Sequence, residues 1–258
     1  MEELKKRYKL QDYKILSVNL SKKHSRPLVF LICEKDKQTY MIKTPLERDN
    51  KISSENLFME YNKLNKYYPG ILNPVLLKPF ALRTNYLFSP SVSRYMNNPF
   101  TRSRYAEKVL KWLVDFHSEQ HKEGIGHIHG DLSLYDVIIQ SGKVIVFDWE
   151  NYSTCEEQLI DVFYMIYKDT FSVCVFGIKD ADISKFVDSL VGDKLHPFLK
   201  KYISLRGIPY TKDRRIIAFK KFISFRIARE EKTFSIPTKD HYLYKKIEAY
   251  FNIGLKNK

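Results

Sequence analysis

The sequence contains little cysteine, little glycine and no long apolar run. Cys33, Cys155 and Cys174 stand far apart among 258 residues, without the close spacing of a zinc site or a disulfide framework. We therefore expect reduced thiols in a cytoplasmic protein. Apolar runs such as residues 28–33 are much shorter than the roughly 18 to 20 residues that a membrane-spanning helix needs. The opening stretch, MEELKKRYKL, also lacks the apolar core of a secretion signal.

Acidic residues are in the minority as well. The formal net charge is +14, and residues 195–258 alone carry +11 of it. Such a basic segment favours an anionic partner, namely a phosphorylated substrate, a nucleic acid or an acidic membrane surface. The alternative is a solvated basic face without a partner. The hydrophobic share of 44% and the aromatic share of 14% indicate a folded protein with a substantial core.

The spacing of apolar residues predicts a small β-rich part followed by a larger helical part. No internal repeat and no low-complexity tract interrupts the chain. In the first part we expect strands at residues 13–20, 27–34, 39–44 and 85–88, a turn at 35–37, a helix at 55–67 and a linker at 89–91. In the second part we expect helices at 101–123, 156–167, 183–202, 212–231 and 241–251, with short strands at 125–127 and within 137–147 around a turn at 141–142. The predicted fold class is therefore α+β, with lobes at 1–90 and 91–258.

The stretch GHIHGDLSLYDVIIQSGKVIVFDWE, residues 126–150, places three aspartates among strand-forming residues. Carboxylates avoid such segments unless cations meet them there. One of Asp131, Asp136 and Asp148 could orient or deprotonate a hydroxyl nucleophile, while the other two hold Mg²⁺ ions that bridge nucleotide phosphates. Phosphoryl transfer also needs a cation on the phosphates. Lys43, at the end of a predicted strand, and Glu60, on the following helix, could supply a lysine fixed by a carboxylate.

These residues carry a resemblance to a known family. HGDL at residues 129–132, Asp136 and FDWE at residues 147–150 are similar to the catalytic core of the aminoglycoside phosphotransferase and choline kinase group, within the protein-kinase-like superfamily. The helical residues 112–117 and Asp161 extend the likeness. The resemblance implies a bilobal fold, with a nucleotide-binding lobe at 1–90 and a catalytic and acceptor-binding lobe at 91–258. It also implies an ATP-dependent kinase that uses Mg²⁺.

The resemblance assigns roles to the three aspartates. Asp131 matches the catalytic aspartate that accepts or orients the substrate hydroxyl, and Asp148 matches a metal-binding aspartate. Asp136 stands where the family usually has asparagine, the second metal ligand. Aspartate is also a hard oxygen ligand, but its extra negative charge near the phosphates predicts a stronger dependence on metal concentration.

The resemblance also implies a nucleotide-binding set in the first lobe. Lys43 would contact the α- and β-phosphates and Glu60 would hold it, with Glu55 as the alternative partner on the same helix. Phe88 and Ser89, where the fourth strand meets the linker, complete the expected set. Between the first two strands, residues 21–26 contain no glycine, whereas protein kinases carry a glycine-rich loop there. This departure argues against a typical protein kinase.

Several residues of the motif region are expected to be structural. His129 is expected to pack and hydrogen-bond in the catalytic loop, and His117 and His127 to be core histidines. Trp149 is expected to pack in the core. Asp161 is expected to cap a helix or to clamp a loop.

The acceptor is expected to be anionic, because the basic excess lies in the helices that usually build the acceptor pocket in this superfamily. A phosphorylated sugar or a lipopolysaccharide core sugar fits this charge, and the helix at 212–231 has an apolar stripe and a basic face that could lie on anionic lipid. We therefore expect a cytoplasmic protein with peripheral attachment at the inner membrane face, and nucleic acid is a less favoured partner. One alternative is a RIO-like atypical serine protein kinase, which the segment 131–136 also resembles. The other is a pseudokinase that binds nucleotide without catalysis.

Overall fold

The computed structural model describes residues 6, 13–19, 28–34, 38–44, 51–77, 81–87, 98–122, 126–171, 177–233 and 237–256. The chain divides into two compact units, which we call the first unit (residues 1–90 and 145–151) and the second unit (91–144 and 152–258). Residues 145–151 belong to the first unit although they lie in the middle of the chain. The expected turn at 35–37, the linker at 89–91 and the loop at 21–26 lie outside the described residues.

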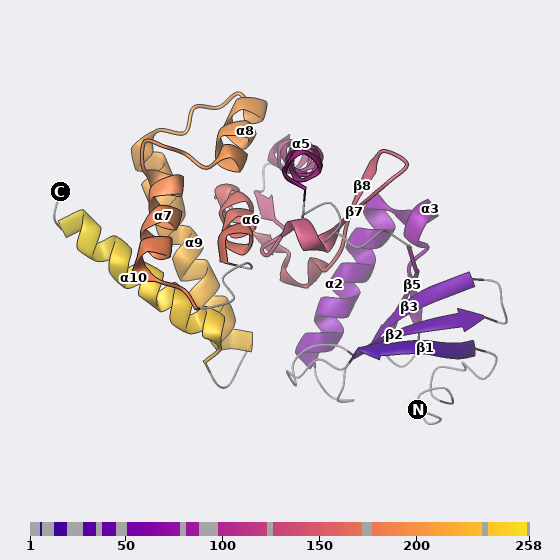
Figure 1. Cartoon of the computed structure of the whole chain (residues 1–258). Helices are drawn as coiled ribbons and strands as arrows, with labels where there is room; N and C mark the ends of the chain where they lie inside the picture. Colours follow the sequence, from indigo (N-terminus) through magenta and orange to yellow (C-terminus); the bar gives the residue numbers. More distant parts are fainter. Residues whose placement is uncertain are drawn as a thin grey trace. The chain divides into compact units, whose positions relative to one another are not determined.

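An antiparallel sheet forms the first unit (Figure 1). Its strands are β1 (Tyr13–Asn19), β2 (Leu28–Glu34), β3 (Gln38–Thr44), β4 (Val75–Leu77) and β5 (Ala81–Asn85). Their order in the sheet is β1-β2-β3-β5-β4, and Lys43 on β3 lies opposite Val29 on β2 and Leu82 on β5. The first three strands match the expected ones to within one residue. The expected strand at 85–88 is wrong, because β5 ends at Asn85 and residues 86 and 87 belong to no strand. Strand β4 was not expected, because three residues are too few to show an alternating pattern.

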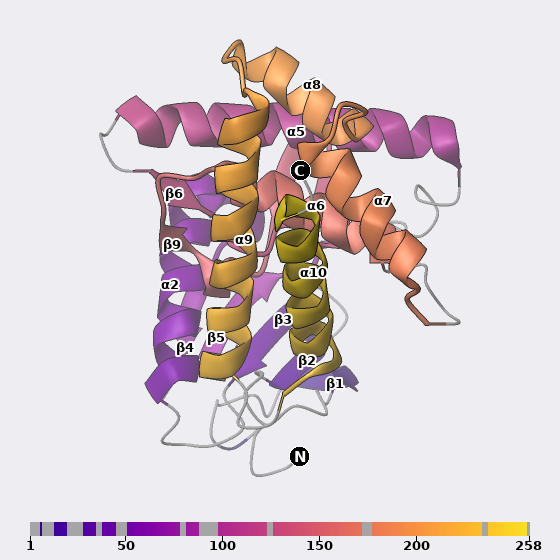
Figure 2. The ribbon, with the colours of Figure 1, turned by 90° about the vertical axis from the view of Figure 1, so that its left-hand side faces the viewer.

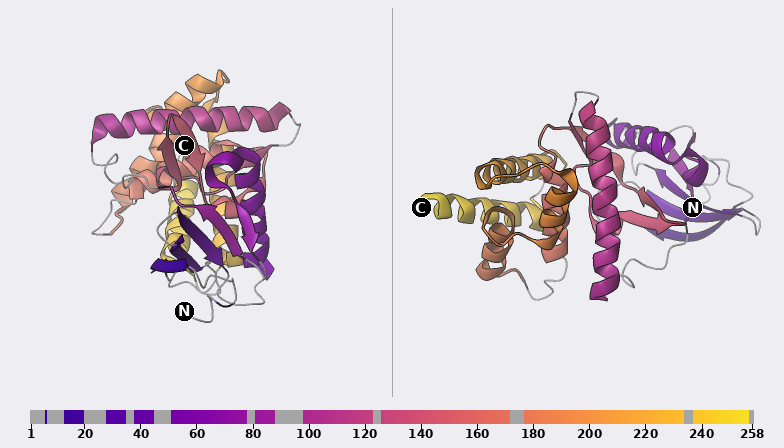
Figure 3. Two further views of the ribbon diagram at one scale, coloured as in Figure 1. Left: turned by 90° about the vertical axis from the view of Figure 1, so that its right-hand side faces the viewer. Right: turned by 90° about the horizontal axis from the view of Figure 1, so that it is seen from above.

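One long helix, α2 (Lys51–Tyr67), packs beside this sheet, as Figure 3 (left) shows, and the short helix α3 (Pro69–Leu72) follows it. Leu57, Glu60 and Leu64 lie at helical spacing on the face of α2 that is buried. Trp149, in the 3₁₀ helix η2 (Trp149–Asn151), is fully buried and its ring stacks on Tyr67 at a centroid distance of 5.6 Å. This packing ties residues 145–151 to the first unit and confirms the expected core role of Trp149.

Helices dominate the second unit, which contains α5 (Pro99–Lys122), α6 (Leu159–Phe171), α7 (Asp180–Val191), α8 (Pro197–Arg206), α9 (Lys212–Thr233) and α10 (Lys239–Lys256). Residues 159–167 of α6 are all buried, so this helix forms the centre of the unit. Figure 2 shows α9 and α10 side by side. Aromatic rings pack between the helices of this unit. For example, the ring of Tyr167 on α6 stacks on that of Tyr244 on α10, with a centroid distance of 4.7 Å. Of the helices that the structure describes, none is long and apolar enough to cross a membrane.

The expected single helix at residues 183–202 is wrong, because the structure has two helices there. Gly192 follows the last residue of α7, and its backbone N–H donates to the Asp188 carbonyl. The chain then turns, and α8 begins at Pro197, which needs no N–H partner in the first turn of a helix. The His196 side chain accepts a hydrogen bond from the Phe198 N–H at 3.2 Å and caps this start.

The motif stretch forms short elements between α5 and α6. Strand β6 (His127–Ile128) pairs with β9 (Ser153–Thr154), a 3₁₀ helix η1 (Leu134–Asp136) follows β6, and β7 (Val137–Gln140) and β8 (Lys143–Val146) form a two-stranded sheet. Ser141 and Gly142 connect β7 to β8 with φ angles of 49° and 79°, the left-handed geometry that two-residue hairpin turns favour. The expected hairpin with its turn at 141–142 is therefore confirmed.

Candidate active site

The first unit brings three charged residues of the predicted site together. The Lys43 ammonium lies 2.8 Å and 3.1 Å from the two oxygens of the Glu60 carboxylate, and it also donates to Oδ1 of Asp148. Lys43 and Glu60 are 6% and 1% exposed, whereas half of the Asp148 side chain is accessible. The pairing that the sequence expected for Glu60 is therefore present. Glu55, the alternative, lies on the exposed part of α2.

Burial gives this ion pair its electrostatic character. Desolvation raises the pKa of the Glu60 carboxyl, while the ammonium of Lys43 acts in the opposite direction. Both oxygens of the buried Glu60 carboxylate bind the Lys43 ammonium, which restricts the positions that the ammonium can adopt. The ammonium is thus fixed beside the half-exposed carboxylate of Asp148.

Asp148 adopts an uncommon backbone conformation. Its φ angle is 58°, in the left-handed region, which costs roughly 1 to 2 kcal/mol for most L-residues and is more readily tolerated by aspartate. The residue lies between β8 and η2, where Trp149 is fully buried and its indole N–H donates to the Val146 carbonyl at 2.9 Å. This packing holds the backbone in place and directs the Asp148 side chain to the Lys43 ammonium. Strained residues of this kind concentrate at functional sites.

The second unit contains the loop of His129, Gly130 and Asp131. His129 is fully buried, and its Nδ1 lies 3.3 Å from Oδ1 of Asp131, whose side chain is 18% exposed. Burial alone would lower the pKa of His129, but the nearby carboxylate of Asp131 outweighs it and raises that pKa to about 9. The ring is therefore charged at neutral pH and stays beside Asp131. The complete burial of His129 agrees with the packing role expected for it.

Asp161, on the first turn of α6, clamps this loop. Its Oδ2 accepts the His129 N–H at 2.8 Å and its Oδ1 accepts the Gly130 N–H at 2.7 Å. Oδ2 also lies 3.1 Å from Nε2 of His117. Asp161, His117 and His129 are all fully buried. A buried carboxylate needs such donors to offset the loss of water. The loop-clamp role expected for Asp161 is confirmed.

His117 links Asp161 to α8. Desolvation lowers the pKa of His117, so the ring is neutral. A neutral ring with its proton on Nε2 donates to Asp161 and accepts from the Tyr202 hydroxyl, which lies 2.7 Å from Nδ1. His117 is the core histidine that the sequence predicted. His127 is only partly buried and stacks on Tyr152 at 4.9 Å.

Asp136 has a structural role of its own. Its Oδ2 accepts the Ser133 N–H at 2.9 Å and the Ser133 hydroxyl at 2.6 Å, while the Ser133 hydroxyl accepts the Tyr135 N–H at 3.2 Å. These bonds form a capping box at the start of η1. The side chain is partly exposed. One oxygen of Asp136 therefore shapes the turn that follows Asp131.

Arg226, on α9, contacts the loop of His129, Gly130 and Asp131, and the sequence did not predict this contact. Its Nη1 donates to the Gly130 carbonyl at 3.0 Å, so it binds the residue that precedes Asp131. The side chain is 4% exposed. Sequence reasoning placed the charged residues of this helix on its solvent face. Its position in the sequence could have indicated burial, because Arg226 lies on the same helical face as the apolar Phe219, Phe222 and Ile223.

The carboxylates of Asp148, in the first unit, and Asp136, in the second unit, are each of the chemical type that binds Mg²⁺. Within the described ranges, no group of three or more His, Cys, Asp or Glu side chains is placed to hold a metal ion. Mg²⁺ needs only one or two protein carboxylates, because substrate phosphates and water complete its shell. Asp148 and Asp136 are hard oxygen donors of that kind. Phe88 and Ser89, the other predicted nucleotide-binding residues, lie outside the described residues.

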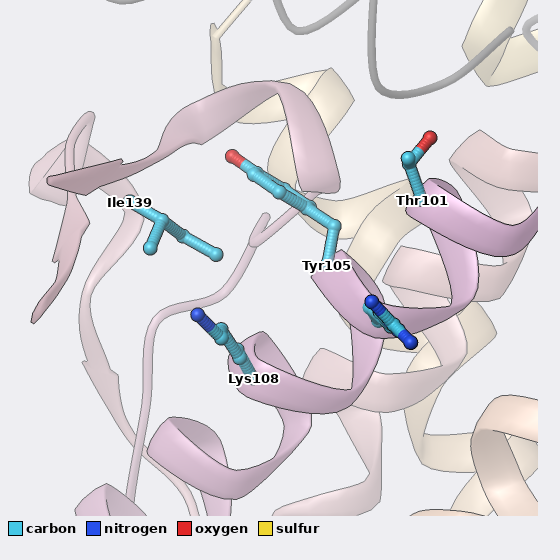
Figure 4. Close-up of a pocket in the computed structure, with 5 residues that line it drawn as sticks. Thr101, Tyr105, Lys108 and Ile139 are labelled. Carbon is cyan, nitrogen blue, oxygen red and sulfur yellow. The ribbon is translucent and has the colours of Figure 1, made fainter. Parts of the chain in front are cut away.

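A separate cavity of about 240 Å³ lies on α5 (Figure 4). Tyr105 and Lys108 of α5 and Ile139 of β7 surround its interior, and Thr101 and Arg104 complete the lining. Arg104 and Lys108 are exposed, whereas Tyr105 is buried and donates its hydroxyl to the Val137 carbonyl. None of the predicted site residues that the structure describes is among these lining residues.

Comparison with known proteins identifies the fold. No protein-family model matches the sequence, and no curated protein sequence matches it. Among solved structures, the ADP-bound aminoglycoside phosphotransferase APH(2'')-Ib is 13% identical over 97% of this chain and 95% of its own, with a TM-score of 0.51. The complex of gentamicin with APH(2'')-IIa (14% identity) and the ternary complex of streptomycin, ATP and APH(2'')-IIa (13%) each cover 97% of this chain and 94% of their own, with TM-scores of 0.50.

At these identities the similarity shows the fold. The chain has the α+β fold found in the solved structures of aminoglycoside phosphotransferases. The resemblance inferred from HGDL and FDWE is thus confirmed at the level of fold.

Proposed function

We propose that the protein is an ATP-dependent phosphotransferase that moves the γ-phosphate of ATP to a hydroxyl group of a small-molecule or glycan acceptor. The observation that carries this proposal is the buried Lys43–Glu60 ion pair, with Asp148 on the same ammonium. A fixed cation beside a metal-binding type of carboxylate is what the phosphates of a nucleotide require. The fold supports the proposal, because similar structures contain ADP or ATP.

The proposed reaction gives each predicted residue a chemical role. Lys43, held by Glu60, binds phosphate oxygens of the nucleotide, and residues 1–90 form the nucleotide-binding lobe. Asp131 accepts the proton of the acceptor hydroxyl as its oxygen attacks the γ-phosphorus. The bond from that phosphorus to the bridging oxygen breaks, which yields a phosphate monoester and ADP. Asp148 and Asp136 are the proposed ligands of Mg²⁺, which would supply charge neutralisation on the phosphates.

The charged histidine next to Asp131 is consistent with a base role for this carboxylate. Nδ1 of His129 lies 3.3 Å from Oδ1 of Asp131, so the ring helps to hold this carboxylate in place in the loop. The capping box of Asp136 and Ser133 then fixes the turn after the base. Asp131 is thus the proposed catalytic residue.

An anionic acceptor suits the charge of the second unit. Exposed basic side chains cover its last three helices, at Lys200, Lys212, Arg214, Lys220, Lys221, Lys232, Lys239, Lys245 and Lys246. This field attracts anions and repels polycations such as gentamicin and streptomycin, the aminoglycosides found with the similar structures. We propose a phosphorylated sugar or a lipopolysaccharide core sugar as acceptor, and anionic lipid as a peripheral contact of the basic helices.

Transfer of labelled γ-phosphate tests this proposal. The protein is incubated with Mg²⁺, γ-labelled ATP and a panel of phosphorylated sugars, glycolipids, aminoglycosides and basic proteins. We expect label on an anionic sugar or glycolipid, and loss of at least about 10²-fold in rate in Asp131→Asn, the range attributed to a general base. Label on aminoglycosides alone would replace the proposed acceptor class, and label on basic proteins would favour the RIO-like alternative. Tight nucleotide binding without any transfer would indicate a pseudokinase.

A further inference from the structure

Arg226 is a charged side chain in an environment that makes charge costly. It is 4% exposed, and its ion pair with Glu230, one turn along α9, measures 3.9 Å, the outer limit of such contacts. Burying a guanidinium is costly even when the charges of Glu230 and Asp131 act on it, and an apolar side chain of similar size usually serves a core as well. The arginine at this position therefore calls for a function that only a fixed donor can provide.

The surroundings of Arg226 hold its guanidinium in one orientation. Its Nε donates to the Tyr244 hydroxyl of α10 at 3.2 Å. Its guanidinium carbon lies 4.2 Å from the ring centroid of Tyr164 on α6 and 5.6 Å from that of Tyr244. Stacking and a directional hydrogen bond together fix a planar fork. Nη1 is thereby aimed at the Gly130 carbonyl, 3.0 Å away.

Gly130 is held from its other side by Asp161. The Gly130 N–H and the His129 N–H both donate to the Asp161 carboxylate, at 2.7 Å and 2.8 Å. Gly130 has a φ angle of 93°, which an L-residue with a side chain rarely adopts. Its N–H is bound by α6 and its carbonyl by α9, so both peptide planes around this flexible residue are fixed. The next residue is Asp131.

We propose that Arg226 is a positioning residue for Asp131, acting through the Gly130 carbonyl as the second half of a clamp whose first half is Asp161. The catalytic meaning of this clamp rests on the proposed function, whereas the clamp itself does not. Glycine would otherwise allow the peptide to rotate and the Asp131 carboxylate to move. A displacement of about 1 Å at a reacting group can cost roughly 10²-fold in rate.

Arg215 provides a matched control on the same helix. It is also buried, at 8% exposure, and it donates to the carbonyls of Leu190, Tyr210 and Gly192 at 3.2, 2.7 and 3.1 Å. None of these carbonyls belongs to the loop of His129, Gly130 and Asp131. Arg215→Lys therefore replaces a buried guanidinium by an ammonium, as Arg226→Lys does, at a different place in the same unit.

Backbone amide exchange tests the clamp without any assumption about activity. In Arg226→Lys, we expect the His129 and Gly130 amides to exchange about tenfold faster or more than in Arg215→Lys, the change expected when a charge-assisted hydrogen bond is lost. Unchanged exchange in Arg226→Lys at these two amides would overturn the clamp. In the wild type, both amides should exchange as slowly as those in the centre of α6. If the His129 and Gly130 amides of the wild type exchange faster than the amides in the centre of α6, the clamp is overturned, even if the variant does not fold.

Kinetics test the positioning role. With an acceptor that the wild type phosphorylates, Arg226→Lys is expected to lower kcat by about 10²-fold and to leave the KM for ATP within about threefold, because the nucleotide contacts are untouched. Arg215→Lys is expected to keep the wild-type kcat. Equal kcat values in the two variants would remove the positioning role. Absence of transfer by the wild type would instead count against the proposed function, and the exchange experiment would still decide the clamp.

Discussion

Replacing Lys43 by methionine tests the buried ion pair of the first unit. Lys43 and Glu60 are almost completely buried, so removal of the ammonium leaves a carboxylate without its cation. Such a loss costs about 3 to 5 kcal/mol in comparable buried pairs. Asp148 contributes less to this cost, because its half-exposed carboxylate regains water when Lys43 is lost.

The expected loss depends on pH. Burial already raises the pKa of Glu60, and removal of Lys43 removes the charge that opposes this rise. A carboxyl group whose folded pKa is raised binds a proton more readily in the folded state, so its destabilisation grows as the pH rises and is relieved as the pH falls. We therefore expect Lys43→Met to be destabilised by about 3 to 5 kcal/mol at pH 8 and by clearly less at pH 5. The double variant Lys43→Met, Glu60→Gln should fall within about 1.5 kcal/mol of the wild type at both pH values, because no charge is left unpaired.

Urea unfolding followed by the fluorescence of Trp149 measures these free energies. Trp149 is buried in the first unit, and a Trp112→Phe background removes the signal of the second unit. Lys66→Met, at the end of α2 where the side chain is exposed, is the control and should change stability by less than about 0.5 kcal/mol. The reasoning is wrong if Lys43→Met loses the same free energy at pH 5 and pH 8, or if the losses of the two single variants add in the double variant.

Three further predictions concern the loop of the second unit. Asp161→Asn should lower the unfolding free energy by about 2 to 4 kcal/mol, because the charged carboxylate accepts both the His129 and the Gly130 N–H. It should also lower the rate of phosphate transfer. Denaturant unfolding measures the first effect and single-turnover kinetics the second. Asp136→Asn should change stability by less than about 1 kcal/mol, since an amide oxygen can still accept from Ser133, and should lower the Mg²⁺ concentration needed for half-maximal rate. His129, with a folded pKa of about 9 against an ordinary 6.5, contributes about 3 kcal/mol that is complete below pH 6.5 and lost as the pH rises through 9. A pH series of unfolding free energies should show this slope in the wild type and not in His129→Gln.

Local sequence patterns predicted most helices and strands because each has a clear apolar period. The helix at 183–202 was an exception. Apolar residues at helical spacing continue from Ile183 to Tyr202, but Gly192 ends one helix and Pro197 begins another. Gly192 and Pro197 are both helix-terminating signals in the sequence, and the helical period of the apolar residues was given more weight than these signals.

Contacts of the motif residues could be predicted from the sequence, whereas contacts that depend on tertiary packing could not. Lys43, Glu60 and Asp161 were inferred from the resemblance, and their contacts agree with it. Arg226 was not inferred, because an arginine on an amphipathic helix is usually solvated and only the packing of α9 against α6 shows otherwise. The same limit applies to residues 145–151, whose local pattern does not reveal that they belong to the first unit.

Nucleotide-dependent thermal stabilisation tests the proposed function most directly. Mg·ATP at about 100 times its Kd should stabilise the wild-type protein by about 2.7 kcal/mol, and ATP without Mg²⁺ by less. Asp148→Asn should lose the Mg²⁺-dependent part of this stabilisation, whereas Asp131→Asn should retain it, because Asp131 is assigned to the acceptor hydroxyl. A wild-type protein whose midpoint of unfolding does not rise with Mg·ATP would contradict the proposal that it is a kinase.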